Sequence, residues 1–277
     1  MDAKADSSKG DLIYRHTATV RITHWVNALV LLVLLMSGLQ IFNAHPALYL
    51  GAKSDFDDPI LSMGTVDEGG TPKGVTTIFG YAIPTTGVFG LSGDAASGYQ
   101  SRGFPWWATL PGYRNLAMGR RWHFFFAWLF LFNGLAYLLW SLGSGHLRRD
   151  LAPSRRDLAH IGASIREHAR LKFPKGEEAK RYNVLQKLAY LAVALVLLPL
   201  MLLTGLGMSP GMDAAFPLLL DIFGGRQTAR TIHFVSATAI VLFVVVHLVM
   251  VVVSGLWNNL RSMITGRYAI EPEEEKP

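Results

Sequence analysis

Two histidines lie fourteen positions apart, His233 and His247, in the apolar run from Arg230 to Leu256. That run is long enough to cross a bilayer as a helix, which takes roughly 20 residues at ~1.5 Å each. Fourteen residues at ~100° each bring a helix back to within about 40° of its starting direction. Both imidazoles therefore share one face, on the order of 21 Å apart along the axis. Ionisable side chains inside a span are costly and point to function, so the spacing predicts two stacked centres.

The composition restricts the ligands that such centres can use. The chain has 277 residues and no cysteine, which removes disulfides, thiolate metal sites, iron–sulfur clusters and covalently attached haem. A metal or redox centre must therefore use histidine, methionine, carboxylate or backbone ligands. The net charge is +6, but the basic residues lie beside apolar runs. This pattern indicates membrane loops rather than nucleic-acid binding.

Four apolar runs predict an all-α membrane protein, a four-transmembrane-helix bundle with a long Gly-rich insert between its first two helices. Pro199 predicts a kink in the third helix. The run Thr76–Phe89 has the composition of a short hairpin within the insert. The expected organisation is an N-terminal segment at 1–21, spans at 22–42, 121–142, 185–206 and 230–256, loops at 43–119, 143–184 and 207–229, and a tail at 257–277.

The basic residues also predict an orientation. Four spans put both termini on one side, together with the basic segment 146–181 between the second and third spans. The positive-inside rule makes that side cytoplasmic, so the insert faces the periplasm of a bacterial inner membrane. A loop as long as 43–119 is usually functional. We expect it to dock a partner.

With this orientation, four histidines sort into two pairs by depth. His24 starts the first span near the inner side, and His123 starts the second near the outer side. The expected pairs are His123 with His233 and His24 with His247. Imidazoles at matched heights on facing helices suit the axial positions of a planar macrocycle. Two other interpretations are weaker: a lone membrane histidine is more often a helix–helix hydrogen bond, and non-haem zinc or copper needs three or more ligands close together.

A haem also needs cations for its propionates and space for its ring. Arginines next to the spans are expected to supply the cations, although ordinary charge flanking explains some of them equally well. Glycines supply space because they lack a side chain. The candidates are Arg21, Arg121 and Arg230 for the propionates, and Gly38 and Gly134 for clearance of the ring.

Three segments carry a resemblance to a known family. RITHWVNALVLLVLLMSG, RRWHFFFAWLFLFNGLAYLL, and RTIHFVSATAIVLFVVVHLV with the later NNLRSMITGRY resemble the prokaryotic di-haem cytochrome b superfamily. This superfamily includes the membrane subunits of nickel–iron hydrogenases, formate dehydrogenases and thiosulfate-reductase-type enzymes, with bacterial cytochrome b561 as a close relation. The resemblance covers all four spans but not the 43–119 insert. It implies that His24, His123, His233 and His247 ligate the iron of two b-type haems.

The resemblance implies an electron-transfer subunit of a quinone-linked respiratory complex. Such subunits pass electrons between a periplasmic redox subunit and membrane quinone. The insert and the stretches HPALYLG and MITGRY look most like the thiosulfate-reductase-type branch, whose partners are periplasmic molybdopterin oxidoreductases. Two bis-histidine haems leave no open iron position, so they carry electrons rather than bind oxygen. The quinone site is not fixed by the sequence; its candidates at the inner edge are His16, Asn27, Asn258 and Asn259.

Three alternatives stay open. The first is a self-contained, quinone-linked oxidase of a small species such as superoxide, for which a large outer loop is unnecessary. The second is a hydrogenase cytochrome b subunit. The third is a non-redox membrane protein, such as a transporter, in which the histidines are structural. Transporters usually show internal repeats and helices broken at mid-membrane, and here only Pro199 interrupts a span.

Overall fold

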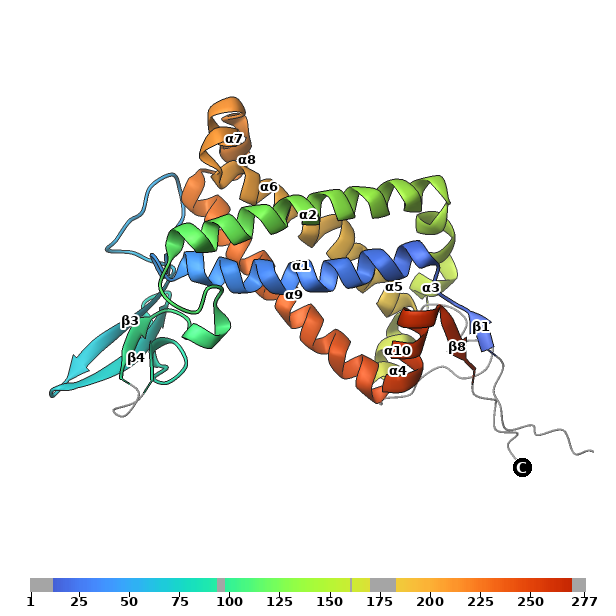
Figure 1. The fold of residues 1–277 in the computed structure, drawn as a ribbon, viewed down its shortest axis with the longest axis horizontal. Helices are drawn as coiled ribbons and strands as arrows, with labels where there is room; N and C mark the ends of the chain where they lie inside the picture. The colour runs from blue at the N-terminus through green and yellow to red at the C-terminus, as the bar shows by residue number, and fades with distance from the viewer. Residues whose placement is uncertain (1–11, 94–97, 160, 170–182, 271–277) are drawn as a thin grey trace, which may run out of the picture. The chain divides into compact units, whose positions relative to one another are not determined.

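The structure is a computed structural model, and it describes residues 12–93, 98–159, 161–169 and 183–270 (Figure 1). The chain divides into two compact units. Unit 1 consists of Met1–Val26, Asn133–Leu197 and Ile240–Pro277, and unit 2 consists of Asn27–Phe132 and Leu198–Ala239. Each unit is described by itself below.

The structure is mostly helical, and four helical segments are long and apolar enough to cross a membrane. They are α1 (Ala18–Phe42), α2 (Leu116–Gly143), the segment Val184–Met208, and α9 (Arg226–Val253). Only 11–22% of their most apolar stretches is buried inside the molecule. The apolar surface left over suits lipid, in which a helix satisfies all its backbone hydrogen bonds internally. The chain is a multi-pass membrane protein, and the four segments overlap the four predicted spans.

Two local features break the regular helix pattern. The segment Val184–Met208 is α-helical in α5 (Val184–Ala192) and α6 (Leu198–Met208), and it widens to π-helix, η4, at Val193–Leu197. Pro199 has no N–H to donate to a preceding carbonyl, which explains the predicted irregularity at this place. The fourth segment ends at Val253 rather than Leu256, because Gly255 has a φ of 109° and stops the helix.

Unit 1 contains a small sheet that joins the two ends of the described chain. Strand β1 (Leu12–Tyr14) pairs antiparallel with β8 (Arg267–Ala269), which follows α10 (Leu256–Thr265). After α2 the chain forms η2 (Leu147–Leu151), α3 (Arg155–Ala159) and α4 (Ile161–Ala169). The basic segment 146–181 lies partly in 170–182, outside the described residues.

The insert in unit 2 corrects the prediction of an all-α fold. Four antiparallel strands have the order β2-β3-β4-β5, and two further strands pair with each other. The hairpin expected near Thr76–Phe89 is present as β4–β5, but the longer β3–β4 hairpin was not predicted. Its turn residues Gly69 and Gly70 have φ values of 65° and 83°, the left-handed backbone that hairpin turns favour. The strands are β2 (Ala47–Leu48), β3 (Leu61–Glu68), β4 (Thr71–Ile78), β5 (Tyr81–Pro84), β6 (Gly90–Ser92) and β7 (Gln100–Arg102).

The core of unit 2 joins the insert to two of the long helices. Phe42 of α1, Leu48 of β2 and Met63 of β3 are buried together, and Phe104 and Phe234 pack against them. Short helices complete the unit: η1 (Trp106–Ala108), α7 (Pro210–Ala215) and α8 (Leu218–Ile222).

Candidate functional site

The structure brings the four candidate histidines together in two pairs. In unit 2, the ring centroids of His123 on α2 and His233 on α9 are 6.3 Å apart, with 60° between the ring planes. In unit 1, the centroids of His24 on α1 and His247 on α9 are 6.2 Å apart, with 63° between the planes. Each pair therefore combines two different helices within one unit.

The spacing of each pair fits two imidazoles on opposite sides of one metal ion. An imidazole nitrogen lies about 2.0–2.1 Å from a bound metal, and each ring centroid lies roughly 1.1 Å further out. Two axial ligands thus place their centroids about 6.3 Å apart. A direct hydrogen bond of about 2.9 Å between ring nitrogens would give only about 5.1 Å. The observed distances of 6.3 and 6.2 Å match the metal geometry and are too long for the hydrogen bond.

Two buried hydroxyl groups set the protonation of the unit 2 pair. Ser37 Oγ lies 3.1 Å from Nδ1 of His123, and it donates its own hydrogen to the Val33 carbonyl at 2.6 Å. Thr204 Oγ1 lies 2.9 Å from Nδ1 of His233 and donates to the Leu200 carbonyl at 2.6 Å. A hydroxyl has one hydrogen, so each oxygen accepts from Nδ1–H.

This arrangement leaves Nε2 of His123 and His233 with a free lone pair. A neutral imidazole carries its proton on one nitrogen and its lone pair on the other. With the proton held at Nδ1, the Nε2 atoms are the ones available to a metal. The residues of this pair thus fit a haem iron in both spacing and protonation.

Glycines allow the two rings to approach these hydroxyls. A Cβ added at Gly38 would lie 3.3 Å from Cε1 of His123, and one at Gly205 would lie 3.3 Å from Cε1 of His233. Gly38 therefore makes room for a ligand ring, whereas its predicted clearance of the porphyrin stays a prediction. A Cβ at Gly134 would meet nothing within 4 Å, so space is available there. Ser37, Thr204 and Gly205 were missed, although the triplets SGL at 37–39 and TGL at 204–206 were a visible signal.

The unit 1 pair has a different environment. The ring of Phe243 is parallel to His247 within 15° at a centroid distance of 6.0 Å, and Trp25 packs edge-on against His24 at 5.4 Å. Trp25 Nε1 donates to the Met263 carbonyl at 3.0 Å and so fixes α1 against α10. Within the described residues, no hydrogen bond reaches either imidazole of this pair.

The three arginines proposed to bind haem propionates differ in the protein groups that they contact. Arg21 donates through Nη1 to the Ile264 carbonyl at 2.5 Å, while its buried Nε has no partner among the described residues. That orphaned donor lies one helical turn before His24 and suits an anionic oxygen. Arg230 donates to the His45 carbonyl at 2.5 Å and lies 5.6 Å from the Phe42 ring centre. Arg121 is exposed. Their contacts with propionates stay predictions.

Other candidates have structural roles or fall short of a metal site. Asn258 exchanges two hydrogen bonds with the Ala269 backbone, and Asn259 bonds the Val251 carbonyl and Ser254. These contacts hold α10 and β8 in place. Burial, reinforced by the charge of Arg15, lowers the pKa of His16 to about 4. Throughout the described part of the chain, no three His, Asp or Glu side chains converge as a zinc or copper site requires.

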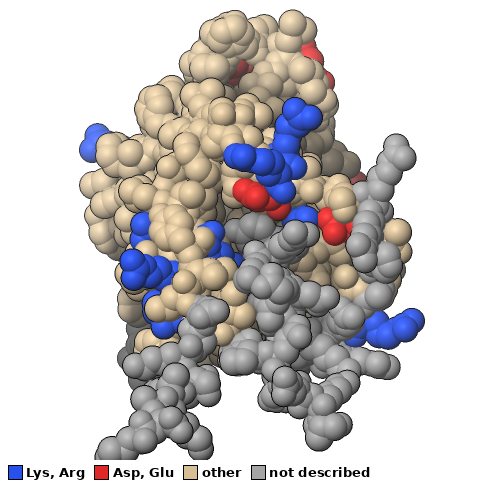
Figure 2. Space-filling model, turned by 90° about the vertical axis from the view of Figure 1, so that its right-hand side faces the viewer, with Lys and Arg blue, Asp and Glu red and all other residues tan. Residues whose placement is uncertain are grey.

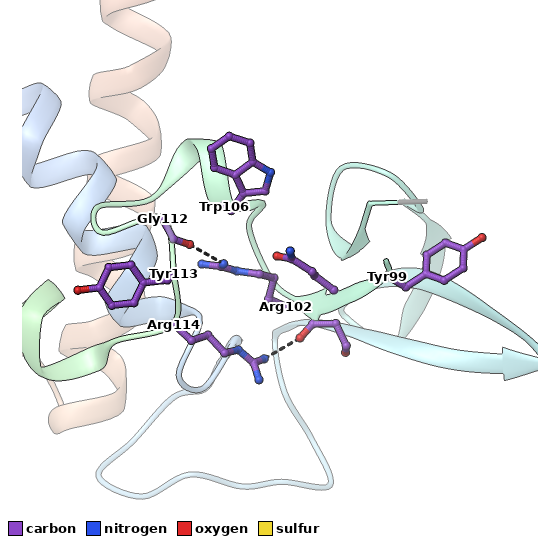
Figure 3. Close-up of a pocket in the computed structure, with 8 residues that line it drawn as sticks. Tyr99, Arg102, Trp106, Gly112, Tyr113 and Arg114 are labelled. Carbon is purple, nitrogen blue, oxygen red and sulfur yellow. Dashed lines mark hydrogen bonds between the residues drawn. The ribbon is translucent and has the colours of Figure 1, made fainter. Parts of the chain in front are cut away.

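A cavity of about 730 Å³ opens in the insert (Figure 3), is lined by residues between Tyr99 and Arg114, and was not predicted. Arg102, which is only 5% exposed, donates to the Gly112 carbonyl at 2.9 Å and to Gln40 Oε1 at 3.1 Å. Arg114 donates to the Ser101 carbonyl at 2.6 Å. Burial and then the charge of Arg114 lower the pKa of Arg102. Neither guanidinium has a carboxylate partner among the residues described, so the cavity is cationic.

The insert is fastened to α9 immediately before His233. Thr231 donates to the Tyr49 carbonyl at 2.7 Å, and the Gly51 N–H donates to Thr228 at 2.7 Å. Gln40, which binds Arg102, lies on α1 two residues after Gly38. The insert and the unit 2 histidine pair are therefore parts of one packed structure.

Comparison with known proteins agrees with this arrangement. The family model described as prokaryotic cytochrome b561 matches residues 15–266. A curated protein of Azospira oryzae is 28% identical over 252 residues, which are 91% of this chain and 96% of that protein. Its name, given there as provisional, is protein-methionine-sulfoxide reductase subunit YedZ1. No solved structure matches the chain with significance.

Proposed function

Because the chain belongs to the prokaryotic cytochrome b561 family, a family of membrane electron-transfer proteins that bind haem b, we propose that it holds two haems. It transfers electrons between the membrane quinone pool and a periplasmic oxidoreductase. The observation that carries this proposal is the 6.2–6.3 Å centroid spacing of both histidine pairs. His24 and His247 would hold one haem b, and His123 and His233 the other. Each haem supplies one-electron chemistry when bound.

The protein's own contribution is binding and insulation. Four histidine ligands, two on each iron, leave no open position and so keep the haems from reacting with oxygen. Arg21 and Arg230 would neutralise propionates, and lipid-facing apolar helices would exclude water from the rings. Since α9 carries one ligand of each pair, fourteen residues apart, both haems attach to the same helix.

We infer the orientation from charge. Both ends of the described chain meet in the β1–β8 sheet, so they lie on one side of the membrane. Figure 2 shows Lys and Arg side chains on the face that carries this sheet and α10. The positive-inside rule makes this side cytoplasmic and the insert periplasmic, in a bacterial inner membrane. Quinone would then react near the unit 1 pair, and the half-buried His16, whose charge would repel that of His24, is proposed for its proton exchange.

The insert supports a partner rather than a self-contained oxidase. It presents a cationic cavity, and it packs against α9 next to His233. The Azospira relative is described as a reductase subunit, so we propose a periplasmic oxidoreductase of that kind, with a molybdopterin cofactor, docked on 43–119. Acidic groups on the partner would complement the exposed Arg114. A superoxide oxidase and a hydrogenase subunit are the alternatives, and neither is favoured by an observation on the described residues.

Haem counting tests the proposal. The purified protein should be red, with a pyridine haemochrome value of about two haems per chain. His233→Ala and His24→Ala should each leave one haem, with different remaining spectra, because they belong to different pairs. His45→Ala is the matched control and should retain both, since His45 bonds Tyr49 and lies outside the pairs. A colourless protein, or loss of the same haem in both variants, would refute the proposal.

A further inference from the structure

We propose that Ser37 and Thr204 are positioning residues that lower the reduction potential of the haem held by His123 and His233, and of that haem alone. This inference rests on the proposed function, because it assumes that the pair ligates a haem. It goes further by assigning electronic tuning to two hydroxyl groups on helices that carry neither ligand. Ser37 is on α1 and Thr204 on α6, whereas the ligands are on α2 and α9.

The two hydroxyls have the same geometry. Each lies about 3 Å from Nδ1 of its histidine, at 3.1 Å for Ser37 and 2.9 Å for Thr204. Each hydroxyl donates its own hydrogen to the backbone carbonyl four residues earlier in its helix. Each is followed by a glycine whose absent side chain leaves space for the imidazole edge. The same arrangement of a hydroxyl group followed by a glycine thus lies next to the Nδ1 atom of His123 and next to that of His233.

Burial makes these acceptors irreplaceable by water. Ser37 and Thr204 are both 0% exposed. A buried N–H that loses its acceptor is strongly unfavourable, so each imidazole is held in the tautomer that directs Nε2 to the metal. The backbone carbonyls of Leu34 and Met201 also lie near these histidines. Removing both hydroxyls together is therefore the stronger perturbation.

The effect on the haem follows from ligand basicity. A hydrogen bond accepted from the non-ligating N–H makes the ligating nitrogen a stronger electron donor. Stronger donation stabilises oxidised iron more than reduced iron, so the potential of the one-electron couple falls. Both ligands of the unit 2 pair are affected in the same sense, and their contributions add.

The other pair supplies an internal reference. Within the described residues, no hydrogen bond is made to the imidazole of His24 or of His247. The neighbours of these rings are the aromatic rings of Trp25 and Phe243. Loss of the two hydroxyls should therefore leave the haem of His24 and His247 unchanged. A general loosening of the fold would change both haems.

A spectroelectrochemical redox titration of the full-length protein in detergent or nanodiscs tests the inference. Ser37→Ala and Thr204→Val should each raise the midpoint potential of one haem, and the double variant should raise it further at two haems per chain. Ser37→Thr and Thr204→Ser keep a hydroxyl and should restore the wild-type potential. An unchanged potential in the double variant, or equal shifts of both haems, would overturn it. If the wild-type protein binds no haem, the proposed function fails first, and the two failures are distinguishable.

Discussion

Gly205→Ala should weaken one haem site while leaving the helix as stable as before. The added Cβ would lie 3.3 Å from Cε1 of His233, which is shorter than the ordinary contact range of 3.4–4 Å. The imidazole must then move by roughly 0.3 Å, which stretches its 2.9 Å hydrogen bond to Thr204. A neutral hydrogen bond contributes about 0.5–1.5 kcal/mol. Its loss would weaken haem retention by up to about tenfold, since 1.4 kcal/mol is tenfold in a dissociation constant.

Haem transfer to apomyoglobin measures this effect directly. One of two haems should leave Gly205→Ala faster than wild-type, while the other leaves at the wild-type rate. The melting temperature should stay constant or rise, because alanine is favoured over glycine in a helix by about 1 kcal/mol. Gly143→Ala is the matched control, since a Cβ there meets nothing within 4 Å. Equal release of both haems, or identical behaviour of Gly205→Ala and the control, would refute the reasoning.

Three further predictions follow from groups outside the histidine pairs. Phe42→Ala should lower unfolding stability by about 3–5 kcal/mol, because it empties the centre of the unit 2 core, as thermal unfolding would show. The pKa of Asp157 is lowered, first by a hydrogen bond from the Ser154 backbone and then by Lys187. Asp157→Asn should therefore cost roughly 0.5 kcal/mol above pH 4, and the difference should vanish as acid protonates the wild-type carboxyl. The pKa of His16 is lowered from 6.5 to about 4, so its neutral form stabilises the fold above pH 6.5, and this contribution is lost on acidification towards pH 4. His16→Gln should therefore flatten the dependence of unfolding stability on pH between about pH 6.5 and pH 4.

The helices and the histidine pairs could be predicted because their signals are long and periodic. A span of twenty apolar residues has few other interpretations, and the spacing of His233 and His247 fixes their common face. The boundary at Val253 could not be placed, because it depends on the backbone conformation of Gly255. The role of the histidines as haem ligands stays a prediction that the geometry supports.

The insert and the surroundings of the ligands were much less predictable. The β3–β4 hairpin has weak alternation of apolar and polar residues, and its turn at Gly69–Gly70 cannot be told from a polar loop by sequence. The cationic cavity depends on Arg102 reaching Gln40, 62 residues away. The hydroxyl partners of the ligands depend on which helices become neighbours, and no pattern within one helix reveals that. A short motif such as SGL or TGL provides a hydrogen-bond acceptor for a histidine only where the fold places a histidine next to it.

The pairing of β1 with β8 brings the two ends of the described chain side by side. Leu12 lies opposite Ala269, so a short linker could join these two strands without disturbing any helix. A circular permutant opened at the exposed Gly69–Gly70 turn would keep all four helices and both histidine pairs. Its new termini would lie in the insert, between α1 and α2 in the native order. Synthesis would then begin with the second helix rather than the first, so the order of insertion could be separated from the final fold.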